Sequence, residues 1–532
     1  MTVTSLPPEA VRAMLRAMMR DRAEMALIDV REEGVFSEEG HPFFANSVPL
    51  SRLELMIRDL VPRQSTRIVV HDGGGEDLAE RAAAKLAQME YGNLATMAGG
   101  ARAWAAAGFE LFTGINVPSK AFGELVEHHC KTPHIAASEL KRRLDAGEEV
   151  LIVDSRPIGE FRNMSIPGAF DCPGAELVYR VPDRLRSADS LVVVNCAGRT
   201  RSIIGAQSLR NAGLVNPVMA LENGTMGWEL AGLELARGRE DALPPPSPAG
   251  LVQARALADQ VASRFGIVRI DDAVLARFEG EADARTPYVF DVRSPEEYAR
   301  GHLAGARSAP GGQLVQATDA YMATRNARIV LIDDDGVRAV MTGSWLVQMG
   351  WPEVYVLDGG AAGRQLVQGT VAATIPEVEA ADVVTLTPVE LKALLDRGEA
   401  AVIDLAPSIA YEAGHIPGAW FAVRARLAHS LGRIPRKSVL VLTSPDGRLA
   451  RLAAADLGGE PRVLEGGTDA WRAAGLPLAT GREAMADTPD DCWRRPYDPY
   501  AGEGARERYL RWEIELVHQI EREGDVGFRV AG

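Results

Sequence analysis

The chain contains few cysteines for its length. Four occur among 532 residues: Cys130, Cys172, Cys196 and Cys492. They are too few for a disulfide framework, and their spacing matches no zinc-binding motif. We therefore expect reduced thiols, and neither a metal ion nor another cofactor.

The sequence also lacks long apolar runs and clusters of positive charge. No stretch approaches the ~18–20 consecutive apolar residues of a membrane span. Residues 7–26 are interrupted by charges such as Glu9, Arg12 and Arg16, which indicates an amphipathic helix rather than a secretory leader. The formal net charge is −15, with no run of lysine or arginine. These absences argue against a membrane or nucleic acid as a partner, so we expect a cytoplasmic protein.

What the sequence does contain is a fourfold repeat. A short apolar strand that ends in aspartate occurs four times, at Asp29, Asp154, Asp291 and Asp404. Each copy is followed by a glycine-bearing turn, at residues 40–42, 164–169, 301–306 and 414–419. Two ordered features that recur together four times indicate tandem copies of one domain.

Two further features complete each copy. A β-branched strand, a loop and a helix rich in alanine or leucine follow, with the strands starting at Ile68, Leu191, Ile329 and Val439. A glycine then precedes a tryptophan by four residues in three copies, whereas in the third copy Gly360 precedes Arg364. Short apolar strands that alternate with helices predict an α/β fold, with a central, mostly parallel sheet flanked by helices in each domain.

The repeat also predicts the domain boundaries. We expect domains at residues 1–117, 125–238, 263–370 and 383–480, with a Pro-rich linker at 239–262 that divides the chain into two pairs. Residues 481–532 form a C-terminal tail, in which residues 509–517 have a helical pattern. We expect this tail to pack back onto a domain as a structural cap.

Taken in order, the Asp-Val-Arg strand end, the Gly-His-Ile-Pro-Gly-Ala turn, the cysteine loop and the Gly-Gly-x-x-x-Trp turn resemble the rhodanese homology domain. The chain is similar to rhodanese-related sulfurtransferases with four such domains, in which only the second repeat bears the catalytic cysteine. This resemblance implies a sulfurtransferase. It would move a sulfane sulfur from thiosulfate or a persulfide donor to a thiol or cyanide acceptor, through a persulfide on Cys196.

The loop after Leu191–Asn195 carries the expected chemistry. It reads Cys196, Ala197, Gly198, Arg199, Thr200, Arg201 and Ser202, and a helix begins near its end. Such a loop points backbone N–H groups inward and adds the positive end of a helix dipole, so an anion is favoured at its centre. We expect a lowered pKa for the Cys196 thiol, arginine contacts from Arg199 and Arg201 to an anionic donor, and backbone or hydroxyl contacts from the other loop residues.

The equivalent loops of the other repeats lack a thiol. Asp72, Asp333 and Ser444 stand at the position of Cys196, and the third loop is expected to be one residue shorter. Carboxylates there would repel an anion, and a hydroxyl cannot store sulfur as a persulfide. We therefore expect three inactive domains.

Three alternatives stay open. The repeats could form a non-catalytic scaffold or sulfur-binding protein, or recruit a partner protein of sulfur metabolism alongside catalysis. A thiol phosphatase is disfavoured, because four residues rather than five separate Cys196 from Arg201. Cys172 could resolve the persulfide as a disulfide, although a buried thiol is the simpler interpretation. The Asp154–Arg156 pair is expected to support the fold.

Overall fold

A computed structural model describes residues 3–370, 374–457 and 460–531. Four sheets of five strands each follow one another along the chain, and we name the domains 1 to 4 after them. The strand order is the same in each: β1-β5-β4-β2-β3, β6-β10-β9-β7-β8, β11-β15-β14-β12-β13 and β16-β20-β19-β17-β18. All pairings between these strands are parallel, which confirms the predicted α/β fold and fourfold repeat.

The strands are short and apolar. Their bounds are β1 (Thr4–Leu6), β2 (Met25–Asp29), β3 (Ala45–Ser47), β4 (Arg67–His71), β5 (Leu94–Met97), β6 (His134–Ile135), β7 (Val150–Asp154), β8 (Phe170–Asp171), β9 (Leu191–Asn195), β10 (Val218–Leu221), β11 (Val268–Ile270), β12 (Pro287–Asp291), β13 (Arg307–Ser308), β14 (Arg328–Ile332), β15 (Glu353–Leu357), β16 (Thr385–Leu386), β17 (Ala400–Asp404), β18 (Trp420–Phe421), β19 (Val439–Thr443) and β20 (Arg462–Leu464). In β2 and β9 every residue is buried, because helices cover both faces of a parallel sheet.

The helices of the first two domains are α1 (Pro8–Asp21), α2 (Glu33–Glu39), α3 (Leu53–Leu60), α4 (Leu78–Gln88), α5 (Gly100–Ala106), α6 (Val117–Cys130), α7 (Ala137–Asp145), α8 (Ile158–Asn163), α9 (Leu177–Arg180), α10 (Thr200–Asn211) and α11 (Gly224–Leu230). Those of the last two are α12 (Pro248–Phe265), α13 (Asp272–Gly280), α14 (Pro295–Arg300), α15 (Gly311–Gln316), α16 (Thr318–Tyr321), α17 (Arg338–Gln348), α18 (Pro376–Glu379), α19 (Pro388–Asp396), α20 (Ser408–Ala413), α21 (Leu427–Ser430), α22 (Arg448–Leu457) and α23 (Gly467–Ala473), followed by α24 (Ala505–Glu523) in the C-terminal tail. In the described part of the chain, no helix is long and apolar enough to cross a membrane.

The aspartate at the end of the second strand of each sheet supports the fold. In domain 2 the Arg156 guanidinium pairs with the Asp154 carboxylate at 2.7 Å, and both side chains are fully buried. Domains 1 and 3 contain the same pair at 2.6 Å, whereas in domain 4 the arginine is replaced by Ala406. Each pair ties a strand end to the turn that follows, since its arginine also donates to a carbonyl of that turn.

The domains do not associate as two sequential pairs. Domain 2 packs on domain 3, where Trp345 Nε1 donates to Ser208 Oγ at 2.8 Å. Domain 1 contacts domain 3 through the Glu24 carboxylate, which accepts from the Thr286 N–H at 2.9 Å. It contacts domain 4 through ion pairs of Arg424. The predicted division into two pairs is therefore wrong.

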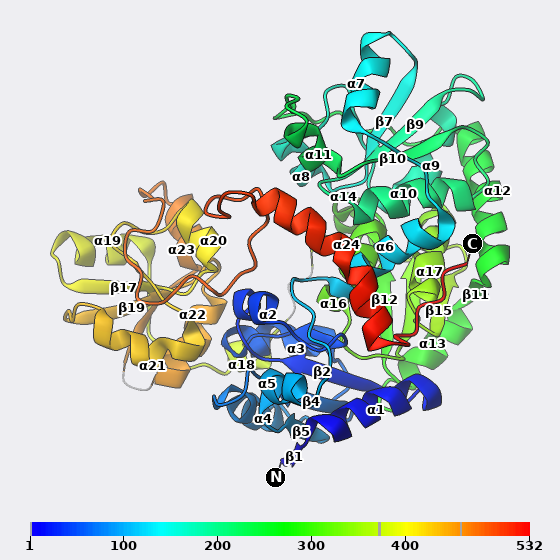
Figure 1. Cartoon of the computed structure of the whole chain (residues 1–532). Coiled ribbons are helices and arrows are strands. Elements are labelled where there is room, and N and C mark those ends of the chain that lie inside the picture. Colours follow the sequence, from blue (N-terminus) through cyan, green and yellow to red (C-terminus); the bar gives the residue numbers. More distant parts are fainter. Residues whose placement is uncertain (1–2, 371–373, 458–459, 532) are drawn as a thin grey trace.

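Residues 239–262, expected as a linker, include most of α12. This helix lies against α9 and α17, and it buries Ala254, Ala258 and Val261 between domains 2 and 3. The C-terminal helix α24 extends from the side of domain 4 to the middle of the molecule and lies along α6 (Figure 1). The tail thus packs where the domains meet rather than on the outside of one of them.

Candidate active site

Cys196 lies directly after β9, in the loop that leads into α10. Its carbonyl oxygen accepts a hydrogen bond from the N–H of Thr225 at 2.9 Å, so the loop is tied to the start of α11. Gly224 makes this approach possible. Its φ is +56°, and a Cβ at this position would lie 2.3 Å from the Cys196 carbonyl oxygen. The Gly-x-x-x-Trp turn therefore holds the loop in place.

The Cys196 thiol is 2% exposed, and its Sγ lies 3.5 Å from Ser202 Oγ. Burial raises the pKa of this thiol above its ordinary value, and the negative charge of Glu513 adds to that effect. Arg201 and Ser202 act in the opposite direction without outweighing burial. The predicted lowering of the pKa is therefore wrong, because the loop is covered by other parts of the chain. The thiol must lose a proton before it can act as a nucleophile.

The two loop arginines differ in what they contact. The Arg199 guanidinium pairs with the Glu124 carboxylate at 2.8 Å and also with Glu127, both on α6. Two carboxylates thus compensate its charge, so the expected contact of Arg199 with an anionic donor does not fit this arrangement. Arg201 pairs with Glu160 of α8 at 2.8 Å and donates to Gln313 of domain 3 at 3.4 Å. Burial works to raise the pKa of Glu160, but Arg201 outweighs it and holds that pKa at about 2.

The remaining loop residues contact the C-terminal tail as well as their own helix. Thr200 Oγ1 donates to a Glu513 carboxylate oxygen at 3.2 Å, and the other oxygen would lie 3.0 Å from a Cβ at Gly198. Ser202 Oγ donates to the Arg199 carbonyl at 2.7 Å, which closes the first turn of α10. A side chain at Gly198 would therefore crowd Glu513 of α24 and Met226, and both side chains would have to shift slightly.

A cavity of about 430 Å³ opens beside the loop, and Ala197 and Arg201 form part of its wall. Every domain and the tail contribute to the remaining wall, through Glu33, Lys120, Gln313, Ile409, Trp493 and Tyr509 among others. A volume of this size suits a small ligand. The loop thus belongs to domain 2, whereas all four domains and the tail share the wall of the cavity beside it.

Lys120 of α6 lines the same cavity and was not predicted as a site residue. It is 2% exposed, and its Nζ donates to the Tyr509 hydroxyl at 2.5 Å. The aromatic rings of Trp493, Tyr509 and Trp512 surround the Nζ at 4.5–5.2 Å from their centroids. No sequence motif marks Lys120; the only signal is the concentration of aromatic residues in the tail that covers it.

Cys172 lies apart from the loop that follows β9. It is fully buried in the core of domain 2, and burial raises the pKa of its thiol well above the ordinary value. The simpler interpretation of a buried thiol fits this position better than a resolving role.

In domains 1 and 4, the residue equivalent to Cys196 binds its own loop. The Asp72 carboxylate accepts from the Gly74 N–H at 2.8 Å and the Ala79 N–H at 3.2 Å. Ser444 Oγ accepts from the Ala450 N–H at 3.3 Å. The sequence predicts only that Asp72 repels an anion. In the structure its carboxylate also fills the place where an anion would bind.

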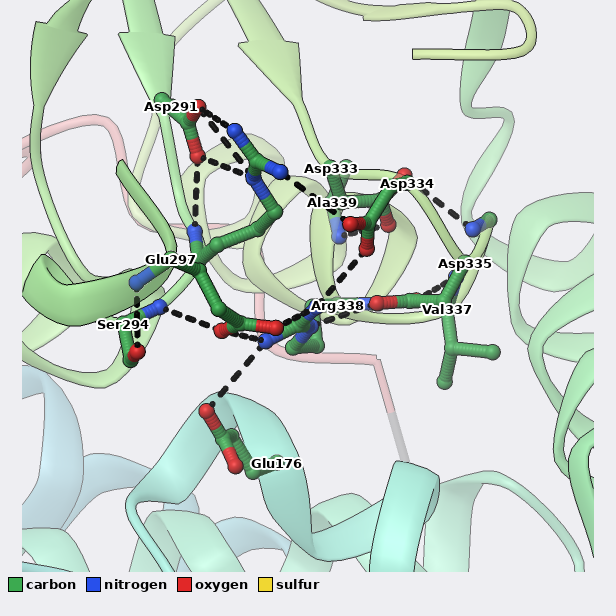
Figure 2. A network of polar contacts seen from close by, with 12 residues as sticks. Glu176, Asp291, Ser294, Glu297, Asp333, Asp334, Asp335, Val337, Arg338 and Ala339 are labelled. Carbon is green, nitrogen blue, oxygen red and sulfur yellow. Dashed lines mark hydrogen bonds and ion pairs between the residues drawn. The ribbon is translucent and has the colours of Figure 1, made fainter. Parts of the chain in front are cut away.

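Domain 3 shows the same arrangement in more detail (Figure 2). The Asp333 carboxylate accepts from the Gly336 N–H at 3.0 Å and from the Ala339 N–H at 2.9 Å. Arg338 stands five residues after Asp333, just as Arg201 stands five residues after Cys196. Arg338 pairs with Glu297, and Arg201 pairs with Glu160 in the same way. The expectation of a shorter third loop is therefore wrong.

Three more carboxylates surround Arg338, which is fully buried. Its guanidinium pairs with Asp335 at 2.5 Å, Asp334 at 3.0 Å and Glu176 of domain 2 at 3.4 Å (Figure 2). The arginine of domain 3 therefore stabilises the loop and the contact with domain 2, and its charge is fully compensated.

Comparison with known proteins agrees with this architecture. A family model described as "Rhodanese-like domain" matches residues 12–107, 136–231, 272–364 and 387–474. A crystal structure of a thiosulfate sulfurtransferase from Pseudomonas aeruginosa is similar over 100% of both chains, with a TM-score of 0.94 and 46% sequence identity.

Two curated relatives match shorter segments. Thiosulfate sulfurtransferase GlpE of Pseudomonas paraeruginosa is 33% identical over 72 residues, which are 14% of this chain and 64% of that protein. The HTH-type transcriptional regulator Rv0324 of Mycobacterium tuberculosis is 37% identical over 106 residues, or 20% of this chain and 45% of the regulator. The chain thus spans less than two thirds of the length of either relative. Because the family model covers most of the chain in four separate matches, the chain belongs to the rhodanese-like family and contains four rhodanese-like domains.

Proposed function

We propose that this protein is a sulfurtransferase, which moves a sulfane sulfur from thiosulfate or a persulfide donor to a thiol or cyanide acceptor through a persulfide on Cys196. One observation carries the proposal. Among four equivalent loop positions, only that of domain 2 holds a thiol, and its loop forms part of the wall of a cavity suited to a small molecule. The similarity to a thiosulfate sulfurtransferase over the full chain supports the same reaction.

The loop can stabilise the negative charge of the persulfide that this reaction forms. The Cys196 thiolate attacks the outer sulfur of thiosulfate, the sulfur–sulfur bond of the donor breaks, and sulfite leaves with the electron pair. The N-terminus of α10 and Arg201 provide positive charge beside the persulfide that forms. In the second step the acceptor attacks the outer sulfur, and the Cys196 thiolate leaves.

The three domains without a thiol have a place in this proposal. Glu33 of domain 1, Gln313 of domain 3 and Ile409 of domain 4 line the cavity, so each of these domains contributes to the wall beside the loop. A purely non-catalytic scaffold would not need such a shared cavity. A partner protein of sulfur metabolism fits the proposal as a source or acceptor of sulfur.

Intact-mass measurement after incubation with thiosulfate tests the proposal. The wild type gains one sulfur atom, Cys196→Ser gains none, and thiocyanate formation from cyanide is lost in that variant. Cys492→Ser serves as the matched control, because Cys492 lies in the C-terminal tail rather than in the loop between β9 and α10, and this variant should leave both results unchanged. Equal sulfur uptake by wild type and Cys196→Ser would contradict the proposal, and release of phosphate from an aryl phosphate would favour a phosphatase.

A further inference from the structure

The proposed reaction leaves open how the Cys196 thiol loses its proton. The thiol is buried and its pKa is raised, which disfavours the thiolate. A proton acceptor near the loop would take up the proton as the thiol reacts. Lys120 is the residue whose position, surroundings and chemistry fit that role.

The position of Lys120 is set by two helices that are distant in sequence. It lies on α6, and α24 runs alongside this helix (Figure 1). The Tyr509 hydroxyl of α24 accepts a hydrogen bond from Lys120 Nζ. Lys120 and Ala197, the neighbour of Cys196 in the loop, line the same cavity. The charge of the Cys196 thiolate also acts on Lys120, whose pKa it raises.

The surroundings of Lys120 favour exchange of a proton. Within the described ranges of the chain, no carboxylate oxygen lies within 4.0 Å of its Nζ, which donates only to the Tyr509 hydroxyl. Burial lowers the pKa of Lys120 to about 8, with Arg201 adding to the decrease and Glu513, Asp319 and Cys196 opposing it. The three surrounding rings stabilise the ammonium form. Both forms of the amine are thus accessible near neutral pH, as acid–base catalysis requires.

A hydrogen-bonded chain connects Lys120 back to the cysteine loop. Lys120 donates to the Tyr509 hydroxyl, Tyr509 donates to Glu513 Oε1 at 3.0 Å, and Thr200 of the loop donates to the same oxygen at 3.2 Å. The second oxygen of Glu513 is buried and has no hydrogen-bond partner among the described residues. The C-terminal tail therefore positions the amine relative to the loop.

We propose that Lys120 is the proton acceptor of Cys196, held in place by Tyr509 and Glu513 of the C-terminal tail. This inference rests on the proposed sulfurtransferase function. The free amine takes the proton of the thiol through bridging water and becomes an ammonium ion, which leaves the thiolate. The thiolate then takes the outer sulfur of thiosulfate, and sulfite leaves. After the acceptor removes that sulfur, the ammonium returns its proton to the Cys196 thiolate, so the net charge of the pair is restored.

The rate of persulfide formation from thiosulfate tests this role, because it isolates the first half of the reaction. In the wild type this rate should rise with pH through about 8, as the amine becomes free. Lys120→Met and Lys120→Arg should both lower the maximal rate by about 100-fold near neutral pH, and the loss should diminish at higher pH, where Cys196 ionises unaided. Arginine keeps the charge but cannot release a proton in this range, so it separates proton transfer from attraction of the donor.

Two results would overturn the inference. If Lys120→Arg keeps the wild-type rate and pH profile, or if Lys120→Met raises only the thiosulfate concentration needed for half-maximal rate, the lysine serves as a charge for the donor. If the Lys120 variants do not fold, Tyr509→Phe decides: loss of the hydroxyl should shift the pH midpoint, and an unchanged midpoint counts against the proposal. The ultraviolet absorbance of the thiolate gives a readout independent of turnover, since it should appear at higher pH in Lys120→Met.

A different result would contradict the proposed function itself. If this protein is not a sulfurtransferase, the wild type takes up no sulfur from thiosulfate. If the wild type takes up sulfur and the Lys120 variants behave as the wild type does, Lys120 is not the proton acceptor, whereas the sulfurtransferase function stands.

Discussion

The loops of domains 2 and 3 share their framework and differ in their charges. In both, an arginine five positions after the first loop residue pairs with a glutamate, Arg201 with Glu160 and Arg338 with Glu297. Domain 2 begins its loop with a thiol and leaves a cavity beside it. Domain 3 begins with Asp333, whose carboxylate takes up two backbone N–H groups of its own loop (Figure 2).

Under the proposed function, the same fold provides a reactive site in domain 2 and a structural joint in domain 3. In domain 3 the loop provides its own carboxyl group at the position of the thiol, and the arginine pairs with four carboxylates, one of them from domain 2. In domain 2 the arginine has a single carboxylate partner and lines the cavity. The first loop residue and the number of acidic partners therefore distinguish the two roles.

Removing the arginine from each loop should give the largest effect. Arg338→Met leaves the Glu297 and Asp335 carboxylates without their ion-pair partner, whereas Glu176 keeps Arg180 and Asp334 keeps Arg293. We expect a loss of about 3–5 kcal/mol in the unfolding free energy of domain 3. Arg201→Met leaves only Glu160 unpaired and should cost less stability, while it slows sulfur uptake. Urea denaturation of both variants measures the difference. Equal losses would show that the extra carboxylates of domain 3 do not stabilise it.

Asp333→Ser, which copies the residue of domain 4, should give a smaller and pH-dependent effect. Burial, together with the charge of Asp335, raises the pKa of Asp333 from 3.8 to about 7. The folded state therefore holds a proton that the unfolded state releases, and wild-type stability falls as pH rises from about 4 to about 7.

The slope for one proton is at most about 1.4 kcal/mol per pH unit. The serine variant lacks this slope, so its stability relative to wild type should increase over that range and stay constant above it. Urea midpoints at a series of pH values provide the measurement. A difference that does not vary with pH would mean that Asp333 is ionised throughout.

Ser444→Cys should give the smallest effect. It places a thiol in the fourth loop, but the position of Arg201 is occupied there by Leu449, so the loop lacks the cation that would stabilise a thiolate. In a Cys196→Ser background we expect sulfur uptake at less than about one hundredth of the wild-type rate, which corresponds to ~3 kcal/mol of lost stabilisation. Uptake at a rate near wild type, measured by intact mass, would show that the thiol alone is enough.

Much of the fold could be predicted from the sequence. The aspartate-terminated strands, the glycine turns and the tryptophan turns recur because each has a local physical cause. Asp154 pairs with Arg156 two residues away, and Gly224 has a conformation and a close contact that exclude a side chain. Such short-range requirements leave a pattern in the sequence, and the position of Cys196 at the end of β9 follows from it.

The surroundings of the loop could not be predicted in the same way. Arg199 was expected to face the donor, yet Glu124 and Glu127 of α6 pair with it. The thiol was expected to have a lowered pKa, yet burial raises it. These contacts come from segments separated by tens to hundreds of residues, and no spacing in the sequence indicates which of them will meet.

The sequence by itself determined the four α/β domains, the single thiol at a strand–loop–helix turn, and the acidic or hydroxyl residues in the other three loops. Only the tertiary structure decided that the domains meet around that thiol, that the C-terminal tail covers it, and that Lys120 lies in the same cavity. The physical reason is the range of the interactions. Backbone geometry and neighbouring ion pairs act within a few residues, whereas the burial and charge that set the reactivity of Cys196 depend on how distant segments pack together.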